Sequence, residues 1–523
     1  MRKEIAYYAN VAYEFQRYLR TKPVADPARR LRESLEKREQ TFLHLVKPAI
    51  FENPATPLHH LLKLAQCNYG DLAAAVKRKG LESALRDLRE AGVYLTSEET
   101  KGRKNVVRHG KEIANSPLAC RNPLVHGGTP GSSSGSRGPA ATSQTPLPWR
   151  LHRDCYDAVM RRDLRYADYT EVALNSILPA VWSLNQAALA FRCGGSVARW
   201  FAPGGTWKDN GHYRFATRLL IAEARLLGYK LPFPEFLADN DFSPVVQFLA
   251  DCRAAGKPAV ARGTVSTVTR LCAEAAERGA DISGTLFNVG GEALTDARRE
   301  LVHAAGCRAV SRYIANETGP VGLGCSHMTD SNTVHFFADS HAIIIVKRPA
   351  PLTDIDVDSL HFTTLYPHAY RVFLNAEIDD SARLIPATCD CEFSRIGFTT
   401  ALTDIHSFGK LTGFGMTLVG TNLLPILEQH LPKTFGGSAA DYQLVESAAN
   451  KQMELTLRVN PRLNANLDDV RVFFLDQVQC VYGGSLTRRT WEHAGSLRVA
   501  AIPPLATRTG KILSLHLASF HES

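Results

Sequence analysis

The sequence contains no apolar run long enough to cross a lipid bilayer. Its most apolar stretch, HAIIIV at His341 to Val346, is far shorter than the roughly 20 residues that a membrane-spanning helix needs. The N-terminal residues also lack a basic start followed by an apolar segment and a small-residue cleavage site. We therefore expect a soluble, cytoplasmic protein with no membrane partner.

Cysteine is scattered and odd in number. The 11 cysteines spread over 523 residues do not resemble the dense, paired pattern of a secreted disulfide scaffold. We expect reduced thiols, with metal binding only where cysteines cluster.

A strongly basic stripe is also missing. Lys and Arg number 61 against 52 Asp and Glu, a formal net charge of +9, and the two signs alternate in stretches such as RRLRESLEKREQ. Basic residues interleaved with acids, without aromatic side chains among them, are not typical of a nucleic-acid interface. We expect no nucleic-acid partner; a mild positive charge favours solubility and anionic ligands.

The chain is too long for one compact core, so at least two domains are expected. Residues 1–115 show apolar positions at helical spacing, and after residue 139 helical segments alternate with short apolar strands, which predicts an α/β core. From about residue 412 the pattern predicts a smaller α+β unit of a strand, a helix and further strands, with RVFFLDQV at 471–478 among those strands. We expect a large domain over 1–411 and a small mobile domain over 412–523.

The stretch TPGSSSGSRGP, residues 129–139, has two interpretations. Its Gly/Ser composition is typical of a flexible linker. Yet it lies inside the folded region, and its glycines, hydroxyls and amides suit a phosphate-binding loop, although the spacing differs from a Walker loop. Taken alone, the stretch leaves both interpretations open.

Three further stretches follow this loop. They are FNVGGEAL at 287–294, SRYIANETGP at 311–320 and PPLATRTGKILSL at 503–515. Together and in this order, the four stretches resemble the ANL superfamily of adenylate-forming enzymes, in particular the phenylacetate-CoA ligase-like branch. The resemblance covers most of the chain from roughly residue 120 to residue 515.

The resemblance implies an ATP site. The loop would hold the phosphates, the glycine-glycine-glutamate turn would lie beside the adenine, Tyr313 would pack on the adenine ring, and Glu317 would help to hold Mg²⁺. Arg137 and Pro139 depart from the usual hydroxyl and lysine of the loop. The implied ATP residues are Ser133, Ser134, Gly135, Ser136, Gly138, Gly291, Glu292, Tyr313, Asn316, Glu317 and Thr318.

The ribose-binding aspartate has two candidates. The segment ending in RLIP places it on Asp380, and TALTDI offers Asp404 as the alternative. The family's hinge between domains corresponds to KLTGFG, where Gly413 is retained but Phe414 and Gly415 replace the usual charged pair.

Lys511 in TRTGK matches the family's catalytic lysine. A carboxylate is a poor electrophile, so such enzymes let it attack the α-phosphate of ATP, and a lysine on a mobile domain bridges the two groups. The small domain then swings, so that a thiol attacks the adenylate.

A second group of residues has the chemistry of a metal site. Cys325 and His335 precede Cys389 and Cys391 by about sixty residues, and three cysteines with one histidine form a usual tetrahedral set for structural zinc. His327 is a possible substitute ligand, and buried reduced thiols are the alternative interpretation.

We therefore predict an enzyme that uses ATP and Mg²⁺ to activate a small or aromatic carboxylic acid and transfers it to a thiol, foremost coenzyme A. A carrier-protein phosphopantetheine, a protein cysteine or an inorganic nucleophile such as a nitrite-derived species are alternative acceptors, and a non-catalytic nucleotide-binding homologue is a further alternative. Residues lining the acid pocket are expected in 261–271 and 310–317. A homodimer is left open.

Overall fold

The structure is a computed structural model. It describes residues 2–132, 142–178, 181–203, 207–237, 241–349, 356–407, 410–411, 418–449, 452–480, 488, 491, 497–506 and 511–517. Within these ranges, no helix combines the length and apolar character needed to cross a membrane.

The N-terminal region is helical, as its periodicity predicts. Helix starts follow local capping rules: Asn68 and Asp71 form a reciprocal capping box at α5, and the Asp26 side chain accepts from the Arg29 backbone N–H at α2. Phe42, Leu45 and neighbouring buried residues pack this region against the far strands of the large sheet. The elements are α1 (Arg2–Arg20), α2 (Pro27–Glu36), α3 (Arg38–Val46), η1 (Lys47–Phe51), α4 (Pro57–Leu64), α5 (Tyr69–Lys79), α6 (Leu81–Glu90), α7 (Ser97–Thr100), β1 (Val106–Arg108) and β2 (Lys111–Ile113).

A 12-stranded mixed sheet forms the body, in the order β13-β14-β15-β16-β12-β11-β10-β9-β8-β5-β6-β7. The half from β10 to β7 is parallel and the other half is antiparallel. The strands are β5 (Thr170–Leu174), β6 (Val197–Ala202), β7 (Pro234–Phe236), β8 (Ala259–Thr264), β9 (Leu286–Gly290), β10 (Arg308–Ala315), β11 (Gly319–Leu323), β12 (Val334–Phe336), β13 (His341–Pro349), β14 (Asp356–Thr364), β15 (Ala376–Pro386) and β16 (Thr400–Ser407).

Helices cover both faces of the parallel half, so the side chains along each strand point alternately into two buried layers. Ala261, Phe287 and Ala309 pack in the cluster that includes α11 and α12. Val260, Leu286 and Val310 pack on the opposite face, in the cluster that includes α8. The helices of the body are α8 (Leu147–Asp163), η2 (Tyr166–Asp168), α9 (Val181–Arg192), α10 (Trp207–Leu226), α11 (Ser243–Ala254), α12 (Val265–Glu277), α13 (Asp296–Ala304) and α14 (Glu392–Ile396).

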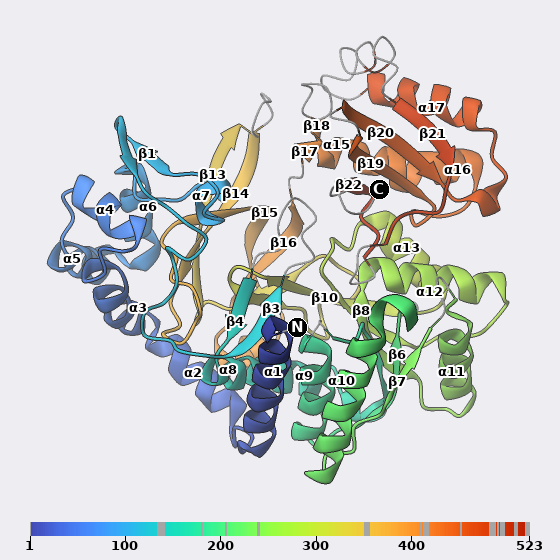
Figure 1. Cartoon of the computed structure of the whole chain (residues 1–523), viewed down its shortest axis with the longest axis horizontal. Helices are drawn as coiled ribbons and strands as arrows, with labels where there is room; N and C mark the ends of the chain where they lie inside the picture. Colours follow the sequence, from blue (N-terminus) through green and yellow to red (C-terminus); the bar gives the residue numbers. More distant parts are fainter. Residues whose placement is uncertain are drawn as a thin grey trace.

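A smaller unit follows, with a four-stranded sheet in the order β21-β20-β19-β22. In Figure 1 this orange-to-red unit lies over α12 and α13 of the body. The predicted boundary between 411 and 412 falls beside residues 412–417, which lie outside the described residues, so it stays a prediction. The elements are β17 (Lys410–Leu411), β18 (Leu418–Val419), α15 (Gly420–Pro425), η4 (Ile426–His430), α16 (Leu431–Phe435), β19 (Tyr442–Ala449), β20 (Gln452–Val459), η5 (Pro461–Leu463), α17 (Leu467–Gln479), β21 (Leu497–Ala501) and β22 (Leu515–Leu517).

One predicted strand is wrong. Residues 471–478 belong to helix α17, because the Asn466 side chain accepts from the backbone N–H groups of Asp468 and Asp469 and starts a helix there. Val470, Phe474 and Val478 are buried at helical spacing. The apolar run is too short to reveal that period without its cap.

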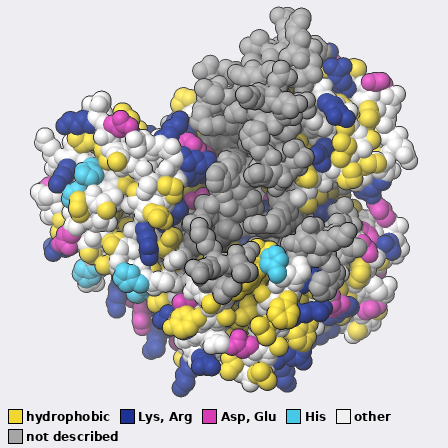
Figure 2. Space-filling view, viewed as in Figure 1, with side chains coloured by type: hydrophobic (Ala, Val, Ile, Leu, Met, Phe, Trp, Pro, Cys, Tyr) yellow, Lys and Arg dark blue, Asp and Glu magenta, His cyan; other side chains and the backbone are white. Residues whose placement is uncertain are grey.

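The charged surface agrees with the interleaved sequence. On the face shown in Figure 2, Lys and Arg side chains are spread around the molecule with Asp and Glu among them. Ion pairs such as Arg29–Glu33 and Arg278–Glu274 follow the one-turn spacing of helices.

Candidate functional site

The turn after β9 brings two of the predicted motifs together. Gly291 has φ +83°, a left-handed conformation that favours glycine. A Cβ placed on Gly291 would lie 2.8 Å from Lys511 Cε and 2.9 Å from Lys511 Nζ. The turn therefore needs glycine for its backbone and for the close approach of Lys511, which comes from the C-terminal unit.

The ammonium group of Lys511 lies in a buried environment. Burial lowers the pKa of its ammonium group, and the carboxylate of Glu292 opposes that shift. Lys511 and Glu292, predicted from separate motifs, thus interact electrostatically at one place.

Glu292 joins the turn to the N-terminus of α12. Its side chain is 2% exposed, and it accepts from the Ser266 backbone N–H and from Ser266 Oγ, both at 2.8 Å. A carboxylate at this position complements the positive end of the helix and satisfies one of its free N–H groups. The glutamate at the predicted ATP turn therefore also has a structural role.

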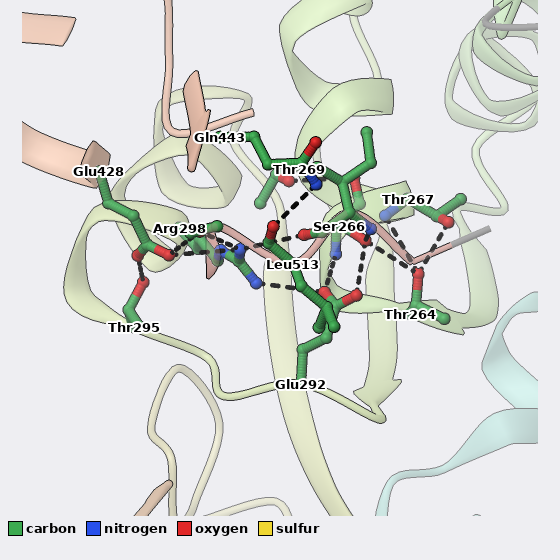
Figure 3. Close-up of polar contacts among 12 residues, drawn as sticks. Thr264, Ser266, Thr267, Thr269, Glu292, Thr295, Arg298, Glu428, Gln443 and Leu513 are labelled. Carbon is green, nitrogen blue, oxygen red and sulfur yellow. Dashed lines mark hydrogen bonds and ion pairs between the residues drawn. The ribbon is translucent and has the colours of Figure 1, made fainter. Parts of the chain in front are cut away.

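Hydrogen bonds with Ser266 and Arg298, both labelled in Figure 3, hold the segment after Lys511. The Ile512 N–H donates to Ser266 Oγ at 2.9 Å, and the Ile512 carbonyl accepts from Arg298 at 3.4 Å. Arg298 also donates to Ser514 Oγ at 2.9 Å. The backbone beside Lys511 is thus tied directly to α12 and α13.

Arg298 carries its charge between two buried carboxylates. Its guanidinium lies 3.1 Å from Glu292 and 3.2 Å from Glu428, and all three side chains are at most 7% exposed. Burial opposes the charge, but Glu428 and Glu292 outweigh it and raise the pKa of Arg298. Glu428 also accepts from Thr295 at 2.5 Å and from Ser514 at 2.6 Å. We call Ser266, Glu292, Arg298 and Glu428 the docking cluster.

Sequence reasoning missed three members of the docking cluster. Ser266, Arg298 and Glu428 belong to no recognised motif, and they meet only when η4 of the small unit packs near α12 and α13. Ser266 lies in the segment 261–271 that is expected to line the acid pocket, whereas only their positions near the GGE motif and before β19 could have drawn attention to Arg298 and Glu428.

Tyr313 and Asp380 form a second pair at the site. The Tyr313 hydroxyl donates to Asp380 at 2.6 Å, and Ser407 Oγ donates to the other carboxylate oxygen at 2.7 Å. Burial raises the pKa of Asp380 to about 6, although both hydrogen bonds favour its ionised form. Asp404, the alternative, pairs instead with Arg383 at 2.6 Å, where both side chains are more than half exposed.

Asn316, Glu317 and Thr318 form the turn between β10 and β11. Glu317 is partly exposed and close enough to contribute to the raised pKa values of Tyr313 and Asp380. Thr318 is buried, and its hydroxyl has no hydrogen-bond partner among the residues that the structure describes. The turn therefore presents a carboxylate and a spare hydroxyl beside Tyr313.

Two predicted features fall outside the described residues. The phosphate loop, with Ser133, Ser134, Gly135, Ser136 and Gly138, is one, and the hinge at Gly413, Phe414 and Gly415 is the other. The described hairpin of β3 (Thr129–Ser132) and β4 (Thr142–Thr145) flanks the loop positions.

The predicted cysteine and histidine group meets at one point. The ligand atoms of Cys325, His335, Cys389 and Cys391 all lie within 4.8 Å of one another. Sulfur–sulfur distances are 3.8 Å from Cys325 to Cys389 and 3.6 Å from Cys389 to Cys391. Tetrahedral zinc with Zn–S bonds of about 2.3 Å requires sulfur–sulfur distances of about 3.8 Å. The four residues could hold such an ion.

His335 is oriented for coordination. Its Nδ1 donates to the Phe398 carbonyl at 2.9 Å, which leaves the Nε2 lone pair facing Cys391 Sγ at 3.1 Å and Cys389 Sγ at 3.4 Å. A hydrogen bond from Cys325 lowers the pKa of Cys391, and the same hydrogen bond raises the pKa of Cys325. His327, the possible substitute, is half exposed and pairs with Asp390, outside this set of four.

No protein-family model matches the sequence, and no curated protein matches it in sequence. Solved structures do match the fold. 2-Hydroxyisobutyryl-CoA ligase in the postadenylation state, in complex with R3-HIB-AMP, aligns with a TM-score of 0.52 over 95% of this chain and 91% of that chain, at 15% identity. In complex with 2-HIB-AMP, the same ligase gives a TM-score of 0.51 over the same shares, at 14% identity.

The chain has the fold of the adenylate-forming ligases. This confirms the predicted α/β class, with a large mixed sheet in the body and a small C-terminal sheet. At this level of identity the likeness establishes the fold, and the chemistry depends on the residues of the site.

The docking cluster makes a first prediction. Arg298→Met leaves Glu292 and Glu428 buried without their cation, which costs about 3 kcal/mol when one partner of a buried pair is removed. We expect amide hydrogen exchange in residues 511–517 to become about a hundredfold faster, as measured by mass spectrometry.

Arg299→Met is the matched control. The guanidinium of Arg299 is next in sequence to Arg298, but it is partly exposed and pairs with Asp296 within α13. That variant should leave exchange in 511–517 unchanged. Equal exchange in both variants would show that Arg298 does not hold the C-terminal segment.

Proposed function

We propose that the protein activates a carboxylic acid with ATP, forming an acyl-adenylate and releasing pyrophosphate, and then transfers the acyl group to a thiol. The observation that carries this proposal is the position of Lys511 against Gly291 at the end of β9. Gly290 pairs with Arg312 on β10, so the Tyr313–Asp380 pair begins one residue away. A lysine, an aromatic ring and a carboxylate therefore converge at the ends of two neighbouring parallel strands.

Each group has a role that its surroundings support. Tyr313 would pack on the adenine of ATP, with Gly291 and Glu292 forming the turn beside it, and Asp380 would accept from the ribose hydroxyls. Glu317, with Asn316 and Thr318 in the same turn, would face the phosphates and help to hold Mg²⁺. The loop at 133–138 would hold the β- and γ-phosphates through its amides and hydroxyls.

The chemistry needs positioning and charge more than a covalent intermediate on the protein. A carboxylate oxygen of the acid attacks the α-phosphorus of ATP, and the bond to the pyrophosphate oxygen breaks. Lys511 is a compact cation that would bridge the attacking oxygen and the α-phosphate. Mg²⁺ would neutralise the charge on the leaving pyrophosphate.

Coenzyme A is the acceptor that we propose, as the name of 2-hydroxyisobutyryl-CoA ligase suggests. A carrier-protein phosphopantetheine, a protein cysteine or an inorganic nucleophile are the alternatives, and membership of the phenylacetate-CoA ligase-like branch is part of the same proposal. The retained Lys511, Glu317 and Asp380 speak against a non-catalytic homologue.

An acid-dependent exchange of pyrophosphate into ATP tests the function. We expect exchange in the wild type, and we expect Lys511→Ala to lower the single-turnover rate of adenylate formation by about a hundredfold or more, because it removes a charge placed for the transition state. Thermal unfolding should be unchanged within a few degrees.

Lys433→Ala is the control, since that lysine lies at the surface in α16 of the same unit. Undiminished adenylate formation in Lys511→Ala would remove the proposed role of Lys511. Product analysis with coenzyme A present then identifies the acceptor.

The pKa of Asp380 makes a prediction about pH. The folded protein protonates this carboxyl at about pH 6, well above a free aspartate. Ribose hydroxyls need the ionised form, so kcat/KM for ATP should fall about tenfold per pH unit below this value. Stability changes with pH in the opposite direction. Because the pKa is raised in the folded protein, the contribution of Asp380 to the free energy of unfolding declines as the pH rises from about 4 to about 6.

Asp380→Asn should give a low, flat profile of kcat/KM for ATP, and Asp404→Asn should keep the wild-type profile. If Asp404→Asn gave the low, flat profile and Asp380→Asn kept the wild-type profile, Asp404 would be the ribose-binding residue. The measurement is kcat/KM for ATP between pH 5 and pH 8, a range chosen around the pKa of about 6.

We also propose that Cys325, His335, Cys389 and Cys391 hold one structural Zn²⁺. The donor set, the distances and the orientation of His335 by Phe398 support this. Zinc would tie the loop after β11 to the segment that starts α14.

Protein purified without added zinc should contain close to one equivalent by metal analysis. Cys389→Ser/Cys391→Ser should lose it and unfold at a temperature lower by at least about 5 °C, because a structural metal contributes directly to folding. Cys480→Ser, at an exposed thiol, is the control. Less than a tenth of an equivalent, with unchanged stability in the double variant, would contradict the site.

A further inference from the structure

Three polar side chains lie on the α8 face of the parallel sheet, near the ends of adjacent strands. Arg262 on β8 is paired with Asn288 on β9, and Arg312 on β10 is paired with Gly290. Two residues earlier, the same face is apolar: Val260, Leu286 and Val310 belong to the core cluster under α8. The face therefore changes from apolar to cationic just before the strands reach the GGE turn and Tyr313.

Arg312 is a buried cation that no carboxylate of the described residues contacts in an ion pair. Its residue is 9% exposed, and its guanidinium donates to the carbonyls of Gly263 at 3.2 Å and Asn288 at 3.3 Å. Among the described residues, Nε has no hydrogen-bond partner and no carboxylate forms an ion pair with Arg312. Buried charges are normally paired, because desolvation is costly without a counter-charge.

Three other buried arginines of the chain obey that rule. Arg161 pairs with Glu171 through both terminal nitrogens, and Arg298 lies between two glutamates. Arg262 pairs with Asp157. Burial and the nearby Arg262 charge lower the pKa of Arg312 to about 10, against the opposing charge of Asp157, so it remains a cation near neutral pH.

Polar atoms beside Arg312 also lack partners. Arg262 Nε and Asn288 Oδ1 are buried without a hydrogen bond among the described residues, although Asn288 Nδ2 donates to Tyr166 at 2.8 Å. Arg262 Nε and Arg312 Nε, on the two strands that flank β9, are unused guanidinium N–H donors that suit a planar anion with two oxygens, whereas Asn288 Oδ1 is an acceptor. The set therefore has the donor chemistry of a carboxylate site.

Arg262, Asn288 and Arg312 lie on β8, β9 and β10, within a few residues of the proposed reaction centre. Gly290, the strand partner of Arg312, immediately precedes Gly291, against which Lys511 lies. Asn288 and Arg262 lie two residues deeper in the sheet. An acid whose reacting carboxylate meets Lys511 would extend its other end toward Arg312.

We propose that the substrate is a small dicarboxylic acid, with one carboxylate activated at Lys511 and the second bound by Arg312, assisted by Arg262. This inference rests on the proposed function and specifies its substrate class. Arg262 and Arg312 also belong to the two segments, 261–271 and 310–317, that are expected to line the acid pocket.

The test compares matched acids with the same carbon skeleton, such as glutarate and pentanoate, in acid-dependent exchange of pyrophosphate into ATP. We expect the wild type to prefer the dicarboxylic acid by about a hundredfold in kcat/KM, as for a buried charge pair. Arg312→Gln should reduce this preference to within a few-fold of unity, mainly through KM. Arg308→Gln, at an exposed position on the same strand, should retain it.

Ligand-induced stabilisation provides a readout that does not depend on catalysis. Added glutarate should raise the unfolding temperature of the wild type and of Arg308→Gln, but not of Arg312→Gln. If no acid supports exchange while this pattern holds, the proposed function fails and the binding site stands. If exchange occurs but the wild type does not prefer dicarboxylic acids, the inference is overturned and the function stands, and this comparison needs no variant.

Discussion

The buried charge of Arg298 is the constraint on which the site depends. Its guanidinium joins Glu292 of the GGE turn, Glu428 of the small unit and the backbone after Lys511. In a low-dielectric interior such a network is favourable only when every member is satisfied, so the two units have one well-defined docked arrangement through it. That arrangement brings the lysine of one unit to the glycine turn of the other.

The same physics distinguishes Arg312 from three other buried arginines. Arg298, Arg262 and Arg161 have carboxylate partners from the protein, and their charges are compensated within the fold. Among the described residues, Arg312 donates hydrogen bonds to backbone carbonyls and forms no ion pair; Asp157 acts on its charge from a distance, and Arg262 lies nearby. Arg150, which is 4% exposed, likewise forms no ion pair among the described residues, so it is the position of Arg312 on β10 beside Tyr313 that supports the proposed carboxylate site.

The group of Cys325, His335, Cys389 and Cys391 is organised differently, because its members lie in separate elements that other contacts hold in place. His335 lies in β12 and is oriented by Phe398, while Cys391 precedes helix α14 as its N-cap residue. These contacts join an antiparallel part of the sheet to a short helix beside α8, some distance in sequence from the lysine and its turn. The Cys/His group and the proposed reaction centre are therefore separate sites in the protein.

Much of this can be predicted from the sequence. Alternating strands and helices indicate the α/β class, and the motifs point to Gly291, Glu292, Tyr313 and Lys511, because short-range spacing and residue type carry that information. The meeting of the three cysteines and the histidine is also predictable, since their shared chemistry is recognisable even across sixty residues. Short-range spacing does not reveal the helix at 471–478, because its cap at Asn466 lies outside the apolar run.

Only the tertiary structure shows that Asp380, and not Asp404, contacts Tyr313, because that contact depends on packing rather than on local pattern. The docking cluster and the unpaired Arg312 could not be predicted either, since a residue's partner, or its lack of one, is set by segments far apart in the chain. Residue types and spacing determined which chemistry this chain can offer. Packing determined which charged side chains find partners within the protein, because burial, not sequence distance, sets the cost of an unpaired charge.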